Sequence, residues 1–87
     1  MVISEFILSN PKGLHARPSA LFVQEALNHE CQITVKKGDI FADAKSILSI
    51  MQLEALHNDI LTIEADGPNE QEAVEALGKI FTITFED

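Results

Sequence analysis

The sequence predicts an α+β fold: a two-layer, open-faced sandwich in which three helices cover one face of a four-stranded antiparallel sheet. Hydrophobic periodicity along the 87 residues indicates the element order β-α-β-β-α-β-α. Two of the expected strands alternate apolar and polar residues, as in a sheet that is covered on one face only. The longer expected helices each carry an apolar stripe, which that covered face would bury. A chain of this length is expected to form one domain, over residues 1–87.

The chain begins with an expected strand and helix. Val2–Leu8 is apolar and rich in β-branched residues, which indicates a strand. Residues 10–13, Asn-Pro-Lys-Gly, are typical of a turn. Residues 16–28 have a helical pattern, and its apolar stripe contains Ser19, Phe22, Val23 and Ala26.

A hairpin and a short helix are expected next. Gln32–Lys37 alternates, with Ile33 and Val35 on one face, and Gly38-Asp39 is a hairpin signal. The return strand is expected over residues 40–43, and residues 46–53 are expected to form a helix of two turns.

The last third of the chain predicts a strand and a helix. A turn at Asn58-Asp59 precedes an alternating strand, residues 60–65, whose inward positions are Leu61, Ile63 and Ala65. Asn69 is the expected N-cap of the final helix, and Glu70 and Glu72 suit its first turn. The buried stripe of that helix is expected to contain Ala73, Leu77, Ile80 and Phe81. Residues 82–85 are poor helix formers, so the pattern leaves the end of the chain open.

Composition restricts the partners. The formal net charge is −8, with fourteen Asp and Glu residues against six Lys and Arg residues. Nucleic acids and anionic membrane surfaces require clustered cations, so neither is an expected partner. The N-terminal residues contain no basic segment and no apolar run of about 20 residues, so neither a signal peptide nor a membrane span is expected. We therefore expect a cytoplasmic protein.

Cys31 is the only cysteine, which excludes an intramolecular disulfide. We interpret it as a small, buried apolar side chain. His29 lies two residues away, but one histidine and one cysteine are too few ligands for a structural zinc site. No metal site is therefore expected.

The stretch GLHARPSA, residues 13–20, contains the only arginine of the chain. The helical pattern begins near Ala16, so His15 is expected at the N-cap. Pro18 then occupies N3, where a missing N–H costs little because that donor has no intrahelical partner. The remaining donor for a capping ring is the N–H of Arg17, and Nδ1 is the expected acceptor.

This arrangement suits a histidine that accepts a phosphoryl group. A helix N-terminus binds phosphate through backbone N–H groups, here those of Ala16 and Arg17, and through its positive dipole end. A guanidinium matches phosphoryl oxygens, and a neutral imidazole is a nucleophile near neutral pH. The plainer alternative is that His15 is only a helix cap. His29 and His57 have no comparable neighbours and are expected to be exposed polar residues.

The expected helices at 16–28 and 46–53 carry more apolar side chains than one buried face accounts for. Exposed apolar patches with polar rims mark interaction sites, so we expect a partner-docking surface beside His15. The alternative is that neighbouring elements cover these side chains. The expected docking surface consists of Ala20, Leu21, Gln24, Leu27, Ile47, Leu48 and Met51.

Ser46 follows Lys45 and opens the short helix. The first interpretation is an N-cap serine. The second is a regulatory phosphorylation site, because a phosphate there would add about −1.5 to −2 charges beside the docking surface.

Two motifs resemble those of a known family. GLHARPSA is similar to the active-site motif of HPr, the histidine-containing phosphocarriers of the bacterial sugar phosphotransferase system, and AKSILSIM resembles the second HPr signature. The resemblance extends over essentially the whole chain. It implies the sheet order 1-4-2-3, no metal or cofactor, and a carrier rather than an enzyme.

The resemblance also implies roles for individual residues. His15 would receive a phosphoryl group on Nδ1 from Enzyme I, which phosphoenolpyruvate charges, and would pass it to an enzyme II A-type domain. Arg17 would stabilise the phosphohistidine. Ser46 would be the substrate of an HPr kinase/phosphorylase in some bacteria, and transcriptional regulators are further implied partners. The carrier is expected to be a monomer.

Some positions depart from the sugar-type pattern. Leu53 is followed by Glu54 rather than glycine, and His57-Asn58 replaces the usual Lys-Gly turn. These positions, the segment GPNEQEA and the acidic end of the chain resemble the nitrogen-related branch of phosphocarriers. Three hypotheses therefore remain: a sugar-uptake carrier, a nitrogen-related regulatory carrier, and an interaction module in which His15 is never phosphorylated.

Overall fold

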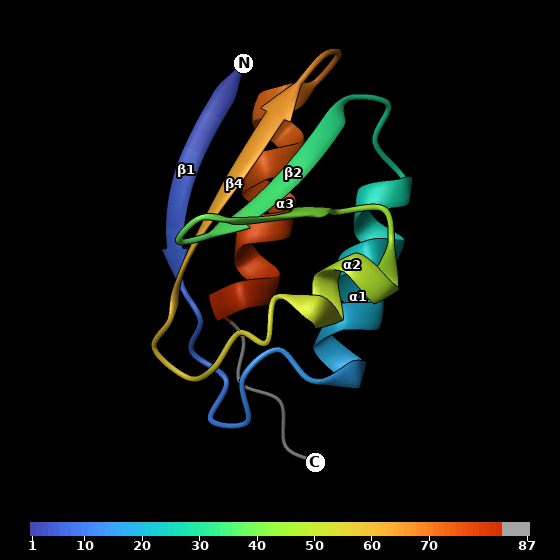
Figure 1. The fold of residues 1–87 in the computed structure, drawn as a ribbon. Coiled ribbons are helices and arrows are strands. Elements are labelled where there is room, and N and C mark those ends of the chain that lie inside the picture. The colour runs from blue at the N-terminus through green and yellow to red at the C-terminus, as the bar shows by residue number, and fades with distance from the viewer. Residues whose placement is uncertain (83–87) are drawn as a thin grey trace.

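The computed structural model describes residues 1–82 and has the predicted element order (Figure 1). Each predicted boundary lies within one residue of the observed one. The end of the chain, which the sequence pattern left open, lies outside the described residues from residue 83 onward. The elements are β1 (Val2–Ile7), α1 (Ala16–Leu27), β2 (Gln32–Lys37), β3 (Ile40–Asp43), α2 (Ile47–Gln52), β4 (Ile60–Asp66) and α3 (Glu70–Thr82).

The four strands form one antiparallel sheet in the order β1-β4-β2-β3, as the resemblance implied. In the register of the sheet, Phe6 on β1 pairs with Leu61 on β4, and Val35 on β2 pairs with Ile63 on β4. The β2–β3 turn contains the two predicted residues, and its Gly38 has a φ of 58°. Because β1 and β4 are neighbours, the loops at the same end of this pair lie close together.

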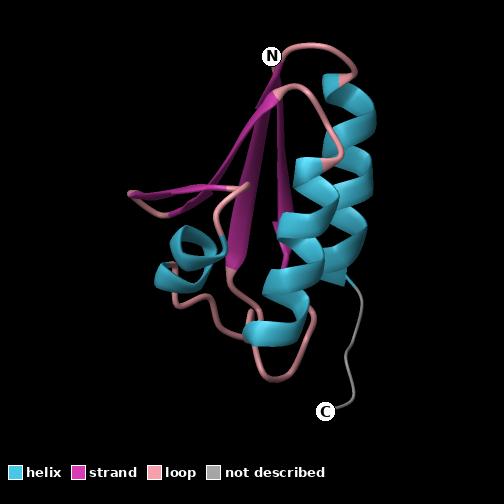
Figure 2. Cartoon of the chain, turned by 90° about the vertical axis from the view of Figure 1, so that its right-hand side faces the viewer, coloured by secondary structure: helices cyan, strands magenta, loops and turns pink. Residues whose placement is uncertain are grey.

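The helices form the second layer. Figure 2 shows α1 and α3 side by side along one face of the sheet. The short α2 packs against α1 and β3. The opposite face is open, and its exposed side chains include Ile3 and Phe41. The open-faced sandwich is therefore confirmed.

The core lies between the two layers. The inward positions predicted for β2 and β4 are buried, and so is the predicted stripe of α1. In α3, Ile80 is only half-buried, and Val74 lies in the core instead. Phe22 of α1 and Phe81 of α3 stack with ring centroids 4.7 Å apart and planes inclined by 8°. This stack joins the two long helices.

The loop between β1 and α1 is packed on the loop that follows α2. Gly13 donates its N–H to the Asn10 carbonyl at 2.9 Å, and the buried Asn10 side chain donates to the Gly13 carbonyl at 2.9 Å. Leu14 then donates its N–H to the carbonyl of Ala55 at 3.0 Å. Gly13 has a φ of 71°, and a Cβ at this position would overlap the Ala55 carbonyl oxygen. Only glycine satisfies both constraints.

Replacing Phe22 with alanine is expected to lower the free energy of unfolding by about 3–5 kcal/mol, because a fully buried ring is replaced by a cavity beside Phe81. Phe41, which is 61% exposed, provides the control: its replacement with alanine should cost less than about 1 kcal/mol. Urea denaturation followed by circular dichroism measures both. Similar losses for the two variants would contradict the position of the core.

Gly13→Ala and Gly38→Ala test the contact of the loop with Ala55. Both glycines have positive φ, but a Cβ on Gly38 would meet open space. Gly38→Ala should therefore cost only the backbone strain, about 1–2 kcal/mol. Gly13→Ala should cost clearly more and should shift the amide resonance of Leu14. Equal losses in urea denaturation, with an unchanged Leu14 amide, would contradict the close approach.

Candidate functional site around His15

His15 is the N-cap of α1, as the sequence predicted. Its backbone is extended, with φ −81° and ψ −171°, and its carbonyl accepts the N–H of Ser19 at 3.1 Å. The predicted hydrogen bond from the Arg17 N–H to Nδ1 is wrong, because the ring makes no capping hydrogen bond to the first turn. Capping residues such as Ser or Asn carry their acceptor on a short, rotatable side chain. The acceptor of histidine belongs to a rigid ring, whose orientation the surrounding packing determines.

Two residues close to His15 in the sequence anchor this part of the chain in the interior. Leu14 and Pro18 lie in the interior, and the Ser19 hydroxyl donates to the Leu14 carbonyl at 3.1 Å. His15 itself is half-buried, and its Nε2 is shielded from solvent. The backbone that presents the imidazole is thus held from both sides, and one of the two ring nitrogens is inaccessible.

The two cations that flank His15 in the sequence are both exposed. Lys12 lies in the loop before the helix, and Arg17 is the second residue of α1. The N-terminus of an α-helix also presents backbone N–H groups and the positive end of the helix dipole. The start of α1 therefore offers positive charge and hydrogen-bond donors to an anion, on a molecule whose net charge is −8.

Apolar side chains are exposed on α1 and on α2, which pack against each other. The outward side chains of α2, Ile47, Leu48 and Met51, are 44%, 67% and 43% exposed. On α1, Leu21 and Leu27 are 41% and 61% exposed. Neighbouring elements do not cover these side chains, so the exposure that the docking hypothesis requires is confirmed. Of the two polar or small members of the predicted set, Gln24 is exposed and Ala20 is half-buried.

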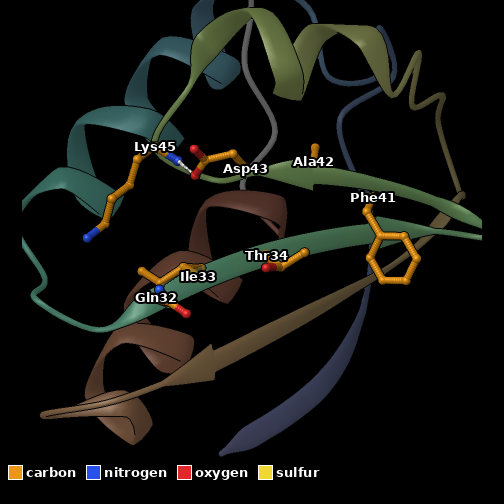
Figure 3. Close-up of a pocket in the computed structure, with 7 residues that line it drawn as sticks. All are labelled: Gln32, Ile33, Thr34, Phe41, Ala42, Asp43 and Lys45. Atoms are coloured by element: carbon orange, nitrogen blue, oxygen red, sulfur yellow. Dashed lines mark hydrogen bonds between the residues drawn. The ribbon is translucent and has the colours of Figure 1, made fainter.

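Ser46 is the N-cap of α2, as predicted. Its Oγ accepts the N–H of Ser49 at 3.3 Å. The turn before it is held by Lys45, whose N–H donates to an Asp43 carboxylate oxygen at 3.0 Å (Figure 3). The Nζ of Lys45 donates to the His29 carbonyl at 2.8 Å. Figure 3 also shows a shallow hollow over the β2–β3 hairpin; the residues that line it belong to residues 32–45, so it is separate from His15.

The other histidines differ from each other. His57 is exposed, as expected, but the expectation of an exposed His29 is wrong: its side chain is 14% exposed, and its Nε2 lies 2.7 Å from Oε2 of Glu25. The two residues are four positions apart, so they share one side of α1 and its C-terminal extension. Cys31 is buried, as predicted. Within residues 1–82, no group of three His, Cys, Asp or Glu side chains is placed to hold a metal ion.

Residues 1–82 contain no helix that is both long enough and apolar enough to cross a membrane. The turn at Asn10 was predicted, but the hydrogen bond of its side chain to the Gly13 carbonyl and the role of Ala55 were not. The hydrogen bond could have been predicted, because asparagine in a turn often bonds to nearby backbone. Ala55 lies between a helix and a strand and carries no periodic signal.

Comparison with known proteins gives a consistent result. The family model "PTS HPr component phosphorylation site" matches residues 2–82. The phosphocarrier protein HPr of Haemophilus influenzae is 49% identical over 73 residues, which are 84% of each chain. The crystal structure of HPr-C-His from Thermoanaerobacter tengcongensis superposes with a TM-score of 0.89 at 40% identity, covering 93% of this chain and 91% of that one.

A further solved relative is Crh of Bacillus subtilis, described as a dimer with a swapped domain. It is 35% identical, with a TM-score of 0.73 and 100% of both chains covered. The family model spans nearly all described residues, including His15 and Ser46. The chain therefore belongs to the HPr family, the phosphocarrier proteins of the phosphotransferase system.

Proposed function

We propose that His15 receives a phosphoryl group from phosphorylated Enzyme I and passes it to an enzyme II A-type domain during sugar uptake. In this proposal the carrier is a cytoplasmic monomer. The observation that supports this proposal is the position of His15. His15 is the N-cap residue of α1, and the hydrogen bonds of Leu14 fix the backbone before it. A fixed nucleophile loses little entropy when it reaches the transfer geometry.

Nδ1 is the proposed acceptor, because Nε2 is shielded from solvent. The neutral ring attacks phosphorus with the Nδ1 lone pair, and a new P–N bond forms. The bond between phosphorus and the donor atom of Enzyme I breaks, and its electron pair returns to that donor. In this step Nε2 keeps its proton. The reverse sequence delivers the phosphoryl group to the next carrier.

The helix start supports the negative charge that arrives with the phosphoryl group. The N–H groups of Ala16 and Arg17 lie in the first turn, where backbone donors and the helix dipole favour anions. The guanidinium of Arg17 is always charged and matches phosphoryl oxygens. These groups favour the phosphorylated state without a metal ion.

The docking surface is proposed to contact both partners. Its apolar side chains lie on α1, the helix that presents His15, and on α2, which packs against α1. A phosphate on Ser46 is proposed as a regulator, because it would place about −1.5 to −2 charges at the start of α2. It would also convert an uncharged cap into a doubly charged one beside Ile47 and Leu48.

The nitrogen-related carrier is the second candidate, and the departures at Glu54 and His57-Asn58 favour it. Both candidates use the same chemistry at His15. Rates of phosphorylation by a sugar-type and by a nitrogen-type Enzyme I distinguish them.

Incubation with phosphoenolpyruvate and Enzyme I should add one phosphoryl group to the wild-type protein and none to His15→Ala. The adduct should be lost in mild acid, as expected for a phosphohistidine. Intact mass spectrometry measures both results, and His57→Ala is the control that should be phosphorylated normally. A protein that gains no mass, or a gain that survives His15→Ala, would favour the interaction module over the carrier.

Leu48→Asp should weaken binding to Enzyme I by at least about tenfold, because it puts a carboxylate in the docking surface. Phe41→Asp is a matched control: the side chain is similarly exposed, 61% against 67%, but it lies on the sheet. Neither variant should change the free energy of unfolding by more than about 1 kcal/mol. Calorimetric titration with Enzyme I measures the affinities. Equal affinities for the two variants, or unfolding of Leu48→Asp, would contradict the proposed surface.

A further inference from the structure

Lys37, the last residue of β2, joins three points of the loop between α2 and β4. Its Nζ donates to the carbonyls of Leu53 and Glu54, at 3.0 Å each, and lies 3.5 Å from Oδ2 of Asp59. Leu53 is the C-cap of α2, so the ammonium also lies at the negative end of that helix. One side chain therefore binds the beginning and the end of the loop.

The loop needs such a partner because its backbone is strained. Glu54 has a φ of 51°, in the left-handed region that favours glycine. A residue with a Cβ pays about 1–2 kcal/mol to adopt that region. The carbonyl of this residue is one of the two that Lys37 binds, so the lysine stabilises the strained conformation directly.

The same loop carries the carbonyl that holds the His15 loop. Asp59 accepts the N–H of Leu56 at 2.8 Å, which closes the loop from its far side. This hydrogen bond, together with the charge of Lys37, lowers the pKa of the Asp59 carboxyl and keeps it ionised. Ala55 lies between the two anchored ends, and its carbonyl accepts the Leu14 N–H at 3.0 Å.

We propose that Lys37 is a positioning residue for phosphoryl transfer at His15. It fixes the strained loop, the loop places the Ala55 carbonyl, and this carbonyl orients Leu14 and the N-cap that follows it. The inference rests on the proposed function, since it takes His15 as the phosphoryl acceptor. In this proposal Lys37 contacts neither His15 nor the partner proteins. Its effect is on the rate of transfer, because small displacements of a reacting atom are costly.

The neighbouring lysine provides a control within the same strand. Lys36 points to the open face, where its Nζ lies 5.2 Å from the centroid of the Phe41 ring. Lys36→Met and Lys37→Met remove the same charge from adjacent positions. Only the second removes the bonds to the loop.

In Lys37→Met, hydrogen exchange of the Leu14 amide should be about tenfold faster than in the wild type, because its acceptor is less well held. Exchange of the β4 amides, which report global opening, should change less. Single-turnover phosphorylation of His15 should slow several-fold, with little change in the affinity for Enzyme I. Lys36→Met should resemble the wild type in all three measurements. Amide exchange is followed by NMR and transfer by rapid quench.

Two rescue variants separate positioning from general destabilisation. Lys37→Arg should keep most of the transfer rate, since a guanidinium also donates to two carbonyls. Adding Glu54→Gly to Lys37→Met should restore both Leu14 protection and transfer, because glycine removes the backbone strain. Unchanged Leu14 exchange in Lys37→Met would overturn the inference, and so would faster exchange with an unchanged transfer rate. If the wild-type protein is not phosphorylated at all, the proposed function fails instead, whatever the exchange data show for the loop.

Discussion

The hydrogen bond between the Leu14 N–H and the Ala55 carbonyl is the contact on which the site depends. It joins two loops that are distant in sequence but leave the same end of the β1–β4 pair. The backbone hydrogen bonding between β1 and β4 continues into these loops. The N–H of Leu8 donates to the Asp59 carbonyl, and the Leu8 carbonyl accepts the N–H of Asn58. The sheet order therefore brings the two loops together, and the missing side chain of Gly13 lets them touch. His15 takes its position from that contact.

The helices and strands were predictable because their signals are local, whereas the strand order came from the family resemblance. Alternation in β2 and β4, the stripe of α1 and the Gly38 turn each need only a few neighbouring residues, and each is where the pattern indicated. Only those features of the site that depend on neighbouring residues were predictable. These are the N-cap positions of His15 and Ser46. The absence of a capping hydrogen bond from the His15 ring was not predicted, since a rigid imidazole does not present its acceptor to the first turn as a short serine or asparagine side chain does. Lys37 could not be found either, because its partners lie 16 or more residues away.

Glu54 is one of the departures from the family pattern, and the contacts of Lys37 explain how the fold accommodates it. A glycine after Leu53 would adopt the positive φ of 51° without strain, and this chain has a side chain there instead. The bonds of Lys37 to the two carbonyls offset part of that cost. With Glu54 in place of glycine, the Ala55 carbonyl still accepts the N–H of Leu14. Divergence at this position is therefore compatible with the proposed phosphoryl chemistry.

The net charge and the cations at the helix start act over different distances. At physiological ionic strength the Debye length is about 8 Å, so charges that lie farther than this from the His15 ring are largely screened. Within the first turn of α1, the backbone presents N–H groups and Arg17 carries a positive charge. The transfer that we propose would require the partner's reacting atom to approach His15 directly, so its contact surface would surround this residue. Leu21 lies about 9 Å along α1 from His15, at 1.5 Å per residue, whereas the exposed Ile3 and Phe41 lie on the open sheet face. Proximity to the proposed nucleophile, rather than exposure alone, is our reason for proposing α1 and α2 as the docking surface.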